Sequence, residues 1–537
     1  MRRTLIALTA LAAVAGQATA QSTATPAQPI PYSGTGQAPA ATAPVGPTAQ
    51  VPPVDPALKA AVLATGTGPD SAYLRTFYAQ RNYERAWSKE DEAVLIEAIN
   101  DADRHGLSPR DFMPPAATVD PLQRDMRLTR AAFAYGAALS FGRIDPNSQE
   151  SIWTLRGHTA DLPTGLNSAI RTNAVRAWVD NLPPTDRGYQ GLTTAFLRYR
   201  EIATKGGWPA WRPGVKLEPG ATDARIPALV ARLVAEGDLA PEDAIPPAGV
   251  AATVYNPVVV AAVKKFQTRH GLGPDGVIGD DTQVELQATA RDRMRQIATN
   301  MERRRWLARD TSPERIDVNV AAAILVYWRE NKPFYGTRVV PGATATQTPS
   351  LEAPFNSVMA NPPWNVPAGI AAKEILPKGA GYMAARGMYV TNGRVVQRPG
   401  PGSALGLVKF EVNNPYAIYL HDTPSKRFFA NTNRHLSHGC VRVQDAVAFA
   451  RMILGFNPEA LAQFDALQAS GETRRVMLGR TIPVRLLYWT AFLDGDGRVS
   501  FRKDVYRRDD KLAKALGLGS MDHLITAKGP AQGDVGP

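Results

Sequence analysis

The spacing of the apolar residues changes near residue 316, and this change limits the fold more than any other feature of the chain. Upstream, apolar residues recur at helical spacing, for example Val94, Leu95, Ala98 and Ile99 after the capping residue Ser88, which predicts packed helices. Downstream, the stretch 316–320 alternates apolar and polar residues, which is typical of half-buried strands. A chain of 537 residues is long enough for about three domains. The sequence therefore predicts a multidomain α+β protein, helical first and mainly β towards its end.

The first 20 residues have the features of an export signal. Arg2 and Arg3 precede a short apolar stretch, and small residues ending at Ala20 form a cleavage site. A signal retained as an anchor is the alternative. The following residues, 21–55, are rich in Pro, Ala, Thr, Gln and Gly and nearly uncharged. Such a composition cannot form a core, so we expect a disordered tether. No later segment is long and apolar enough to cross a membrane.

The net charge of +12 fits an anionic partner such as nucleic acid, a membrane surface or an acidic polymer, and it also fits simple solubility. No long Lys/Arg run and no nucleic-acid motif occurs, which argues against nucleic acid as the partner.

Before the strands, the chain divides into a helical part, a small unit and a connecting helix. Residues 56–245 carry no cluster of chemically active side chains, so we interpret them as a helical scaffold. Residues 249–290 predict a compact unit in which helices flank the turn at Asp275–Gly276. Residues 291–315 predict a linking helix. Its arginines are expected to form a solvated face: Arg293, Arg303, Arg304 and Arg305.

Residues 316–510 are expected to form the mainly-β domain, followed by a C-terminal tail at 511–537. Alternation and β-branched residues predict strands at 316–320, 323–327, 407–412 and 417–420, and a hairpin of 481–493 with 499–503. The Asp/Gly run 494–497 resembles a calcium loop, but the twelfth position is Val505, so we interpret it as the hairpin turn. The Gly- and Pro-rich stretch at about 361–405 is too long for an ordinary connection and predicts a functional flap.

The only cysteine of the chain, Cys440, lies in Ser437-His438-Gly439-Cys440-Val441-Arg442. In an exported protein a lone cysteine has no intramolecular disulfide partner, which favours a chemical role. A thiol with a pKa of about 8.5 needs a base near neutral pH, and His421, 19 residues upstream, is the candidate. The neighbouring Arg434, His435, His438 and Arg442, and a helix predicted after Val443, would favour a thiolate.

A zinc site is the alternative for these residues. His435 and His438 are three positions apart, and with Cys440 and His421 they number four potential ligands. The order Ser-His-Gly-Cys and the glycine before the sulfur suit an exposed nucleophile better, so we expect no metal and no cofactor.

The motif resembles that of the L,D-transpeptidase (YkuD-domain) family, cysteine enzymes that cross-link peptidoglycan. The residues that carry the resemblance are His421, Ser437-His438-Gly439-Cys440-Val441-Arg442 and the segments 361–367, 373–378 and 399–406. Likewise, 262–267, 271–272, 275–279 and Thr282 resemble the small peptidoglycan-binding module of wall enzymes. Together they resemble the large periplasmic members, with a helical scaffold, a three-helix binding module and a mainly-β catalytic domain under a capping flap. Smaller members have Asn where this chain has Arg442.

The resemblance implies that Cys440 is the nucleophile and His421 the general base and acid. Gly439 and Cys440 would supply oxyanion N–H groups, while His438, Ser437, Tyr419 and Arg442 would shape the substrate site. Arg442 suits a substrate carboxylate. The implied reaction is a 3-3 cross-link between peptidoglycan stem peptides through a thioester, in the periplasm, with acylation by carbapenems and possible cooperation with other wall synthases. A Cys-His carboxypeptidase or endopeptidase and a non-catalytic wall-binding adaptor are the alternatives.

Overall fold

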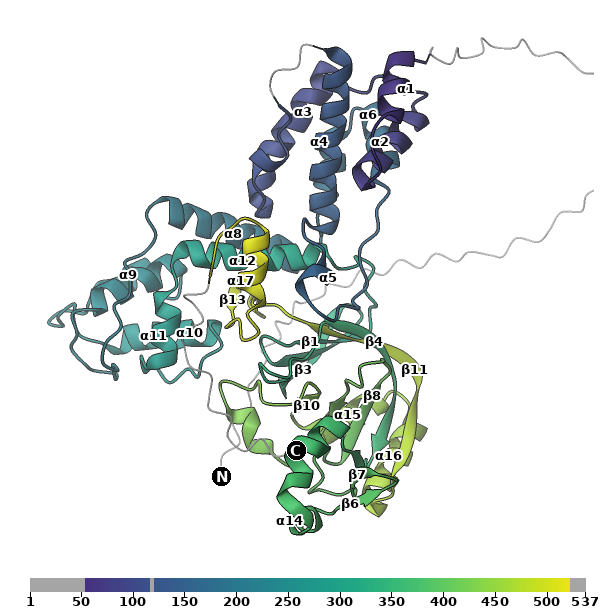
Figure 1. Ribbon diagram of the computed structural model, residues 1–537. Coiled ribbons are helices and arrows are strands. Elements are labelled where there is room, and N and C mark those ends of the chain that lie inside the picture. The colour runs from purple at the N-terminus through teal and green to yellow at the C-terminus, as the bar shows by residue number, and fades with distance from the viewer. Residues whose placement is uncertain (1–53, 116–119, 522–537) are drawn as a thin grey trace, which may run out of the picture. The chain divides into compact units, whose positions relative to one another are not determined.

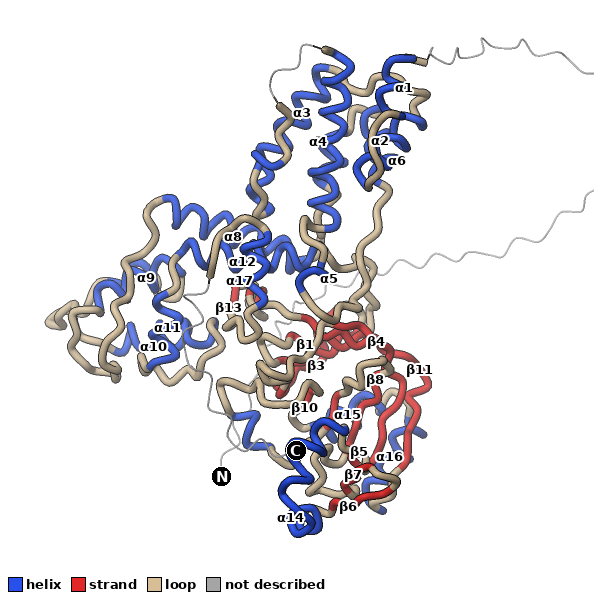
Figure 2. Tube along the Cα trace, viewed as in Figure 1, coloured by secondary structure: helices blue, strands red, loops and turns tan. Residues whose placement is uncertain are grey.

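The computed structural model describes residues 54–115 and 120–521 (Figure 1). The predicted signal and nearly all of the predicted tether lie outside these residues. Helices dominate before residue 306, and a β-barrel with its helices follows (Figure 2). The predicted multidomain α+β class is therefore confirmed. Among the described helices, none has both the length and the apolarity that crossing a bilayer would require.

Most of the scaffold helices begin at a first turn capped by a side chain, and most contribute to one apolar core. The Ser88 hydroxyl accepts the Asp91 N–H at 3.0 Å, as the sequence predicts, and starts the helix after it. This helix ends at Asn100, and a 3₁₀ turn continues it to Gly106, whose φ of 69° ends the segment. The helices are α1 (Pro56–Leu63), α2 (Pro69–Gln80), α3 (Lys89–Asn100), α4 (Pro121–Phe141), α5 (Pro146–Gln149), α6 (Leu162–Arg171), α7 (Val175–Asp180) and α8 (Arg187–Thr204).

The next compact unit is larger than the sequence predicts. It contains α9 (Ile226–Glu236), α10 (Pro257–Arg269) and α11 (Asp280–Gln287). One hydrophobic cluster joins Trp211, Leu229 and Leu233 to Val263 and Phe266. The helix α9, assigned from sequence to the scaffold, therefore packs with the predicted 249–290 unit.

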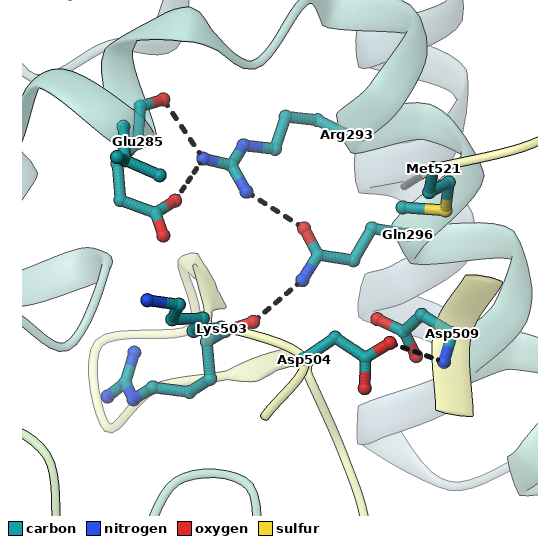
Figure 3. A pocket seen from close by; sticks show the side chains of 9 residues that line it. Glu285, Arg293, Gln296, Lys503, Asp504, Asp509 and Met521 are labelled. Carbon is teal, nitrogen blue, oxygen red and sulfur yellow. Dashed lines mark hydrogen bonds and ion pairs between the residues drawn. The ribbon is translucent and has the colours of Figure 1, made fainter. Parts of the chain in front are cut away.

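The linking helix α12 (Ala290–Arg305) corrects the sequence interpretation, because Arg293, Arg303 and Arg305 are buried and Arg304 is largely buried, instead of forming a solvated face. Arg293 bonds Glu285 and Gln296, and these groups line a cavity of about 20 Å³ (Figure 3). Arg303 pairs with Asp509, and Arg305 pairs with Glu302 at 2.6 Å. Each buried cation has an acidic partner, which is the condition under which a charge is tolerated in a core.

The predicted mainly-β domain folds as a closed barrel in the order β1-β11-β4-β8-β9-β10-β3-β2. Its strands are β1 (Arg315–Asn319), β2 (Ile324–Arg329), β3 (Lys332–Val340), β4 (Leu351–Ala360), β8 (Val408–Val412), β9 (Leu420–His421), β10 (Val441–Val443) and β11 (Arg474–Leu487). Alternate residues such as Val408, Phe410 and Val441 fill the core. Two helices, α15 (Ala446–Leu454) and α16 (Pro458–Ser470), contribute Phe449 and Phe464 to the same cluster.

The predicted flap region has a small core of its own. It contains a three-stranded sheet in the order β5-β7-β6, of Trp364–Asn365, Arg394–Gln397 and Met388–Thr391. Helices α13 (Ala368–Ile370) and α14 (Gly379–Ala385) and a π-helical turn, Ala371–Ile375, complete it. Trp364, Ile375 and Leu405 form its cluster, and Tyr419 of the barrel packs against it.

The predicted hairpin and the predicted C-terminal tail both differ from the structure. The predicted strand 481–493 is divided between β11 and β12 (Ala491–Leu493), which pairs antiparallel with β13 (Val499–Phe501). The turn between them is closed by Asp494, whose carboxylate accepts the N–H groups of Asp496 and Arg498. The predicted tail begins inside a helix, α17 (Arg508–Ala515), because Leu512 is buried against Trp306.

Candidate active site

Three adjacent strands bring the candidate residues to the outer face of the barrel. In the sheet, β9 lies between β8 and β10, and His421 is in register with Lys409 on one side and Arg442 on the other. Their neighbours Leu420 and Val441 point into the core. Because side chains alternate along a strand, Cys440 and Tyr419, each two residues from these partners, lie on the outer face with His421. The sequence alternation around His421 and Cys440 therefore places the sulfur and the imidazole on one surface.

The loop before Cys440 is held by main-chain and hydroxyl contacts. Gly439 has a φ of +112°, a conformation that side-chain-bearing residues rarely adopt. The Ser437 hydroxyl accepts the Gly439 N–H at 3.1 Å and donates to the Cys440 carbonyl at 2.5 Å. The Gly439 carbonyl accepts the Thr348 hydroxyl at 2.8 Å. Ser437 thus shapes the loop, and the Gly439 N–H, expected from sequence to face an oxyanion, is bonded to Ser437 instead.

His421 is held in one tautomer. Its Nδ1 lies 2.5 Å from the Asp422 carbonyl oxygen, and since a carbonyl only accepts, Nδ1 carries the proton and Nε2 has the free lone pair. Burial, together with Arg442, Lys409 and Lys426, lowers the pKa of His421 to about 3, although the Asp422 carbonyl opposes this. His421 is therefore neutral at pH 7 and available as a base.

Cys440 corrects the expectation of a preformed thiolate. Burial raises the pKa of its thiol, and Tyr419, Lys409 and Arg442 offset this only in part. The thiol donates to the Ala417 carbonyl, with sulfur and oxygen 3.6 Å apart, while the residue stays partly exposed. Strand β10 separates Cys440 from the start of α15 by roughly 10 Å of extended chain, and a helix dipole acts only near its first turn. The Cys440 thiol is thus neutral near pH 7, as is the imidazole of His421.

The pH dependence of the alkylation rate of Cys440 should show that its thiol is neutral near pH 7. We expect the midpoint of the rise in rate to lie at a higher pH in the folded protein than in the urea-unfolded chain, because burial disfavours the thiolate, which is the form that reacts with iodoacetamide. Each pKa unit of difference lowers the thiolate fraction at neutral pH about tenfold. Whole-protein mass spectrometry measures the rate directly, because Cys440 is the only cysteine. Fast alkylation at pH 6 would show instead that an ion pair is preformed.

Tyr419, Arg442 and Lys409 lie around His421. The Tyr419 ring lies edge-on to His421 with centroids 5.6 Å apart, and the Lys409 ammonium lies 4.5 Å from the Tyr419 centroid. Arg442 is 3% exposed, and burial lowers the pKa of its guanidinium to about 10. Sequence reasoning missed Lys409, although its outward position in the predicted strand 407–412 was a signal. The pairing of that strand with His421 was not visible without the register.

The other predicted residues have different positions. His438 Nε2 lies 2.7 Å from Glu374 of the flap, which sequence reasoning also missed. His435 bonds Asn433 and the Val320 carbonyl through its two nitrogens, and Arg434 donates to the carbonyls of 322 and 323. These two side chains therefore bind carbonyl oxygens, and burial lowers the pKa of His435 to about 4, so His435 adds no positive charge near pH 7. No group of three or more His, Cys, Asp or Glu in residues 54–115 and 120–521 is arranged to hold a metal ion.

Comparison with protein families divides the chain into three parts. Residues 72–196 match a scaffold domain, 223–286 a "putative peptidoglycan binding domain" and 313–482 an L,D-transpeptidase catalytic domain. The second match includes α9, in agreement with the shared cluster of α9 and α10.

One relative and one solved structure are similar to part of this chain. A Haemophilus influenzae protein named "Putative L,D-transpeptidase" is 31% identical over 224 residues, 37% of this chain and 45% of that protein. The match thus spans less than half of the relative's length. A crystal structure of the L,D-transpeptidase (residues 123–326) from Xylanimonas cellulosilytica matches 51% of this chain and 100% of its own, with 16% identity and a TM-score of 0.17.

Proposed function

We propose that this chain, a multidomain protein with an L,D-transpeptidase catalytic domain at residues 313–482, forms 3-3 cross-links between peptidoglycan stem peptides through a thioester on Cys440. The observation that supports the proposal is the outer face of β8, β9 and β10, where Arg442 is the register partner of His421 and Cys440 lies two residues before Arg442, on the same side of the chain. The binding domain at 223–286 suggests a wall-associated protein, and we propose the periplasm as its location.

In the proposed first half-reaction, Cys440 attacks the carbonyl of the third residue of a donor stem. The thiol proton passes to Nε2 of His421 as the carbon–sulfur bond forms. The Cys440 N–H has no hydrogen-bond partner in the described residues, so it is the available donor for the oxyanion. As the tetrahedral adduct collapses, His421 returns the proton to the departing amine of D-Ala, and a thioester remains.

In the second half-reaction, the side-chain amine of another stem's diamino acid attacks the thioester. Its excess proton passes to His421 and then to the departing thiolate, which restores the starting pair. Water in place of the amine would give a carboxypeptidase. The flap lies against this site through the contact of Glu374 with His438 and the packing of Tyr419, so we propose that it covers the donor stem.

Incubation of the mature protein with purified tetrapeptide-rich muropeptides tests this function, with Cys440→Ala as the blank. We expect cross-linked dimers and free D-Ala by mass spectrometry. Shortened monomers alone would identify the hydrolase alternative. Binding to sacculi with no product of either kind would identify the adaptor.

A further inference from the structure

His421 lies between two cations, and in the described residues only Lys409 has a carboxylate within ion-pair distance. Its register partner on β8 is Lys409 and its register partner on β10 is Arg442, so the three side chains share the outer face. The guanidinium of Arg442 makes no hydrogen bond or ion pair in the described residues; its recorded neighbour is the Phe428 ring, 5.8 Å away. A buried cation without an acidic partner is costly, which points to an anion supplied from outside.

Acidic side chains around the site are already engaged. Glu411 is 3.9 Å from Lys409, but its carboxylate is bound by Arg475 and by the Ser357 hydroxyl. Asp422 pairs with Lys426 and accepts the Leu407 N–H.

The flap contributes Glu374, which contacts His438. Local carboxylates therefore leave the charge of Arg442 uncompensated, and Glu411, which Lys409 shares with Arg475, compensates Lys409 only in part.

We propose that Lys409 and Arg442 together bind the carboxylate of the leaving D-amino acid of the donor stem. This inference rests on the proposed function in taking the ligand to be a stem peptide. The geometric reason is that His421 protonates the departing amine, and in an α-amino acid the carboxylate is attached to the carbon that bears this amine. The carboxylate must therefore lie close to His421, where the two cations are.

Binding of the carboxylate also prepares the base. Burial, Arg442 and Lys409 together lower the pKa of His421 to about 3. A bound anion compensates both cations and favours the imidazolium that forms when Cys440 gives up its proton. The donor thus assists its own attack, and a donor with a neutral end at this position loses that assistance.

Two alkylating reagents test the subsite without any cross-linking activity. Iodoacetate carries a carboxylate and iodoacetamide a neutral amide, and in both reactions the Cys440 sulfur displaces iodide. Because both need the same thiolate, the ratio of their rate constants is independent of the pKa of Cys440. We expect the ratio to be roughly fivefold or more above that of N-acetylcysteine, to fall several-fold in Lys409→Met, and to fall in 0.5 M salt.

Matched variants make the result specific. Lys409→Arg keeps the charge and should keep the ratio. Lys332→Met, an exposed lysine at the opposite end of β3 from the residues that pair with β10, removes the same charge and should leave the ratio unchanged. A wild-type ratio equal to that of the free thiol, or one that Lys409→Met does not change, would overturn the proposal. The salt effect is measured on the wild type, so this part of the test does not depend on whether a variant folds.

Donor peptides extend the test to turnover. A tetrapeptide donor with a C-terminal carboxamide should react more slowly than the carboxylate form in the wild type, and this difference should shrink in Lys409→Met. If neither donor reacts but the reagent ratio behaves as expected, the proposed function fails while the anion site stands. If cross-links form but the two donors react equally, the assigned occupant is wrong.

Discussion

His421→Ala is expected to lower the rate of cross-link formation by about 10²–10⁴-fold, because it removes the imidazole that we propose takes the thiol proton. The Nδ1 proton of His421 is fixed on the Asp422 carbonyl, which leaves the lone pair of Nε2 available to act as the base. Cys440→Ala should remove product formation altogether. The double variant should be no slower than Cys440→Ala, because groups acting as a unit do not contribute additively.

The measurement is the initial rate of dimer formation from tetrapeptide muropeptides, with melting curves to show that each variant is folded. His158→Ala is the matched control, since His158 is a partly exposed histidine outside the barrel. An His421→Ala enzyme within about threefold of the wild type would fall well short of the loss of a general base and would contradict the assigned role. A product-forming Cys440→Ala enzyme would contradict the thioester.

The prediction of Cys440 and His421 as the reacting residues rests on local signals. The only cysteine, the glycine before it and an upstream histidine at a strand end are visible in a single chain. The environment of the pair was not local. Lys409 meets His421 through an antiparallel register, and Arg434 and His435 turn to carbonyls at 320–323. The prediction relied on residues close to Cys440 in the sequence and therefore overestimated the positive charge around its sulfur. Burial raises the pKa of the thiol instead.

The fold shows the same division. Alternation and capping predicted strands and helix starts such as those at Ser88 and 316–320, because each signal lies within the element. The burial of α12 was not predictable in this way. Arginines usually lie at the surface, and the acid that neutralises Arg303 is Asp509, on α17. The domain limit at 249 was misplaced for a related reason, since α9 packs on α10 through contacts between separate helices.

Arg303→Met is expected to cause the largest loss of stability among single changes outside the active site. The side chains of Arg303 and Asp509 are 4% and 1% exposed, so the change leaves a buried carboxylate without its cation. Such a loss typically costs about 3–5 kcal/mol, or roughly 5–15 °C in the apparent melting temperature of a domain this size. Arg291→Met, an exposed arginine on the same helix, should change it little.

The stability loss in Arg303→Met should depend on pH, and the pKa of Asp504 gives the direction. Burial and the neighbouring Asp509 raise the pKa of Asp504 to about 7, while Arg303 opposes the shift. A carboxyl with a raised folded pKa contributes stability below its unfolded value, and this is lost as pH rises through the folded pKa. Without Arg303 the buried acids repel more strongly, so the deficit of Arg303→Met should be larger at pH 8 than at pH 5.5. Arg303→Met/Asp509→Asn should recover part of the loss at pH 8, because it removes the uncompensated charge. Equal deficits at both pH values, with no recovery in the double variant, would show that Arg303 stabilises the protein by packing on Tyr488 and not by its charge.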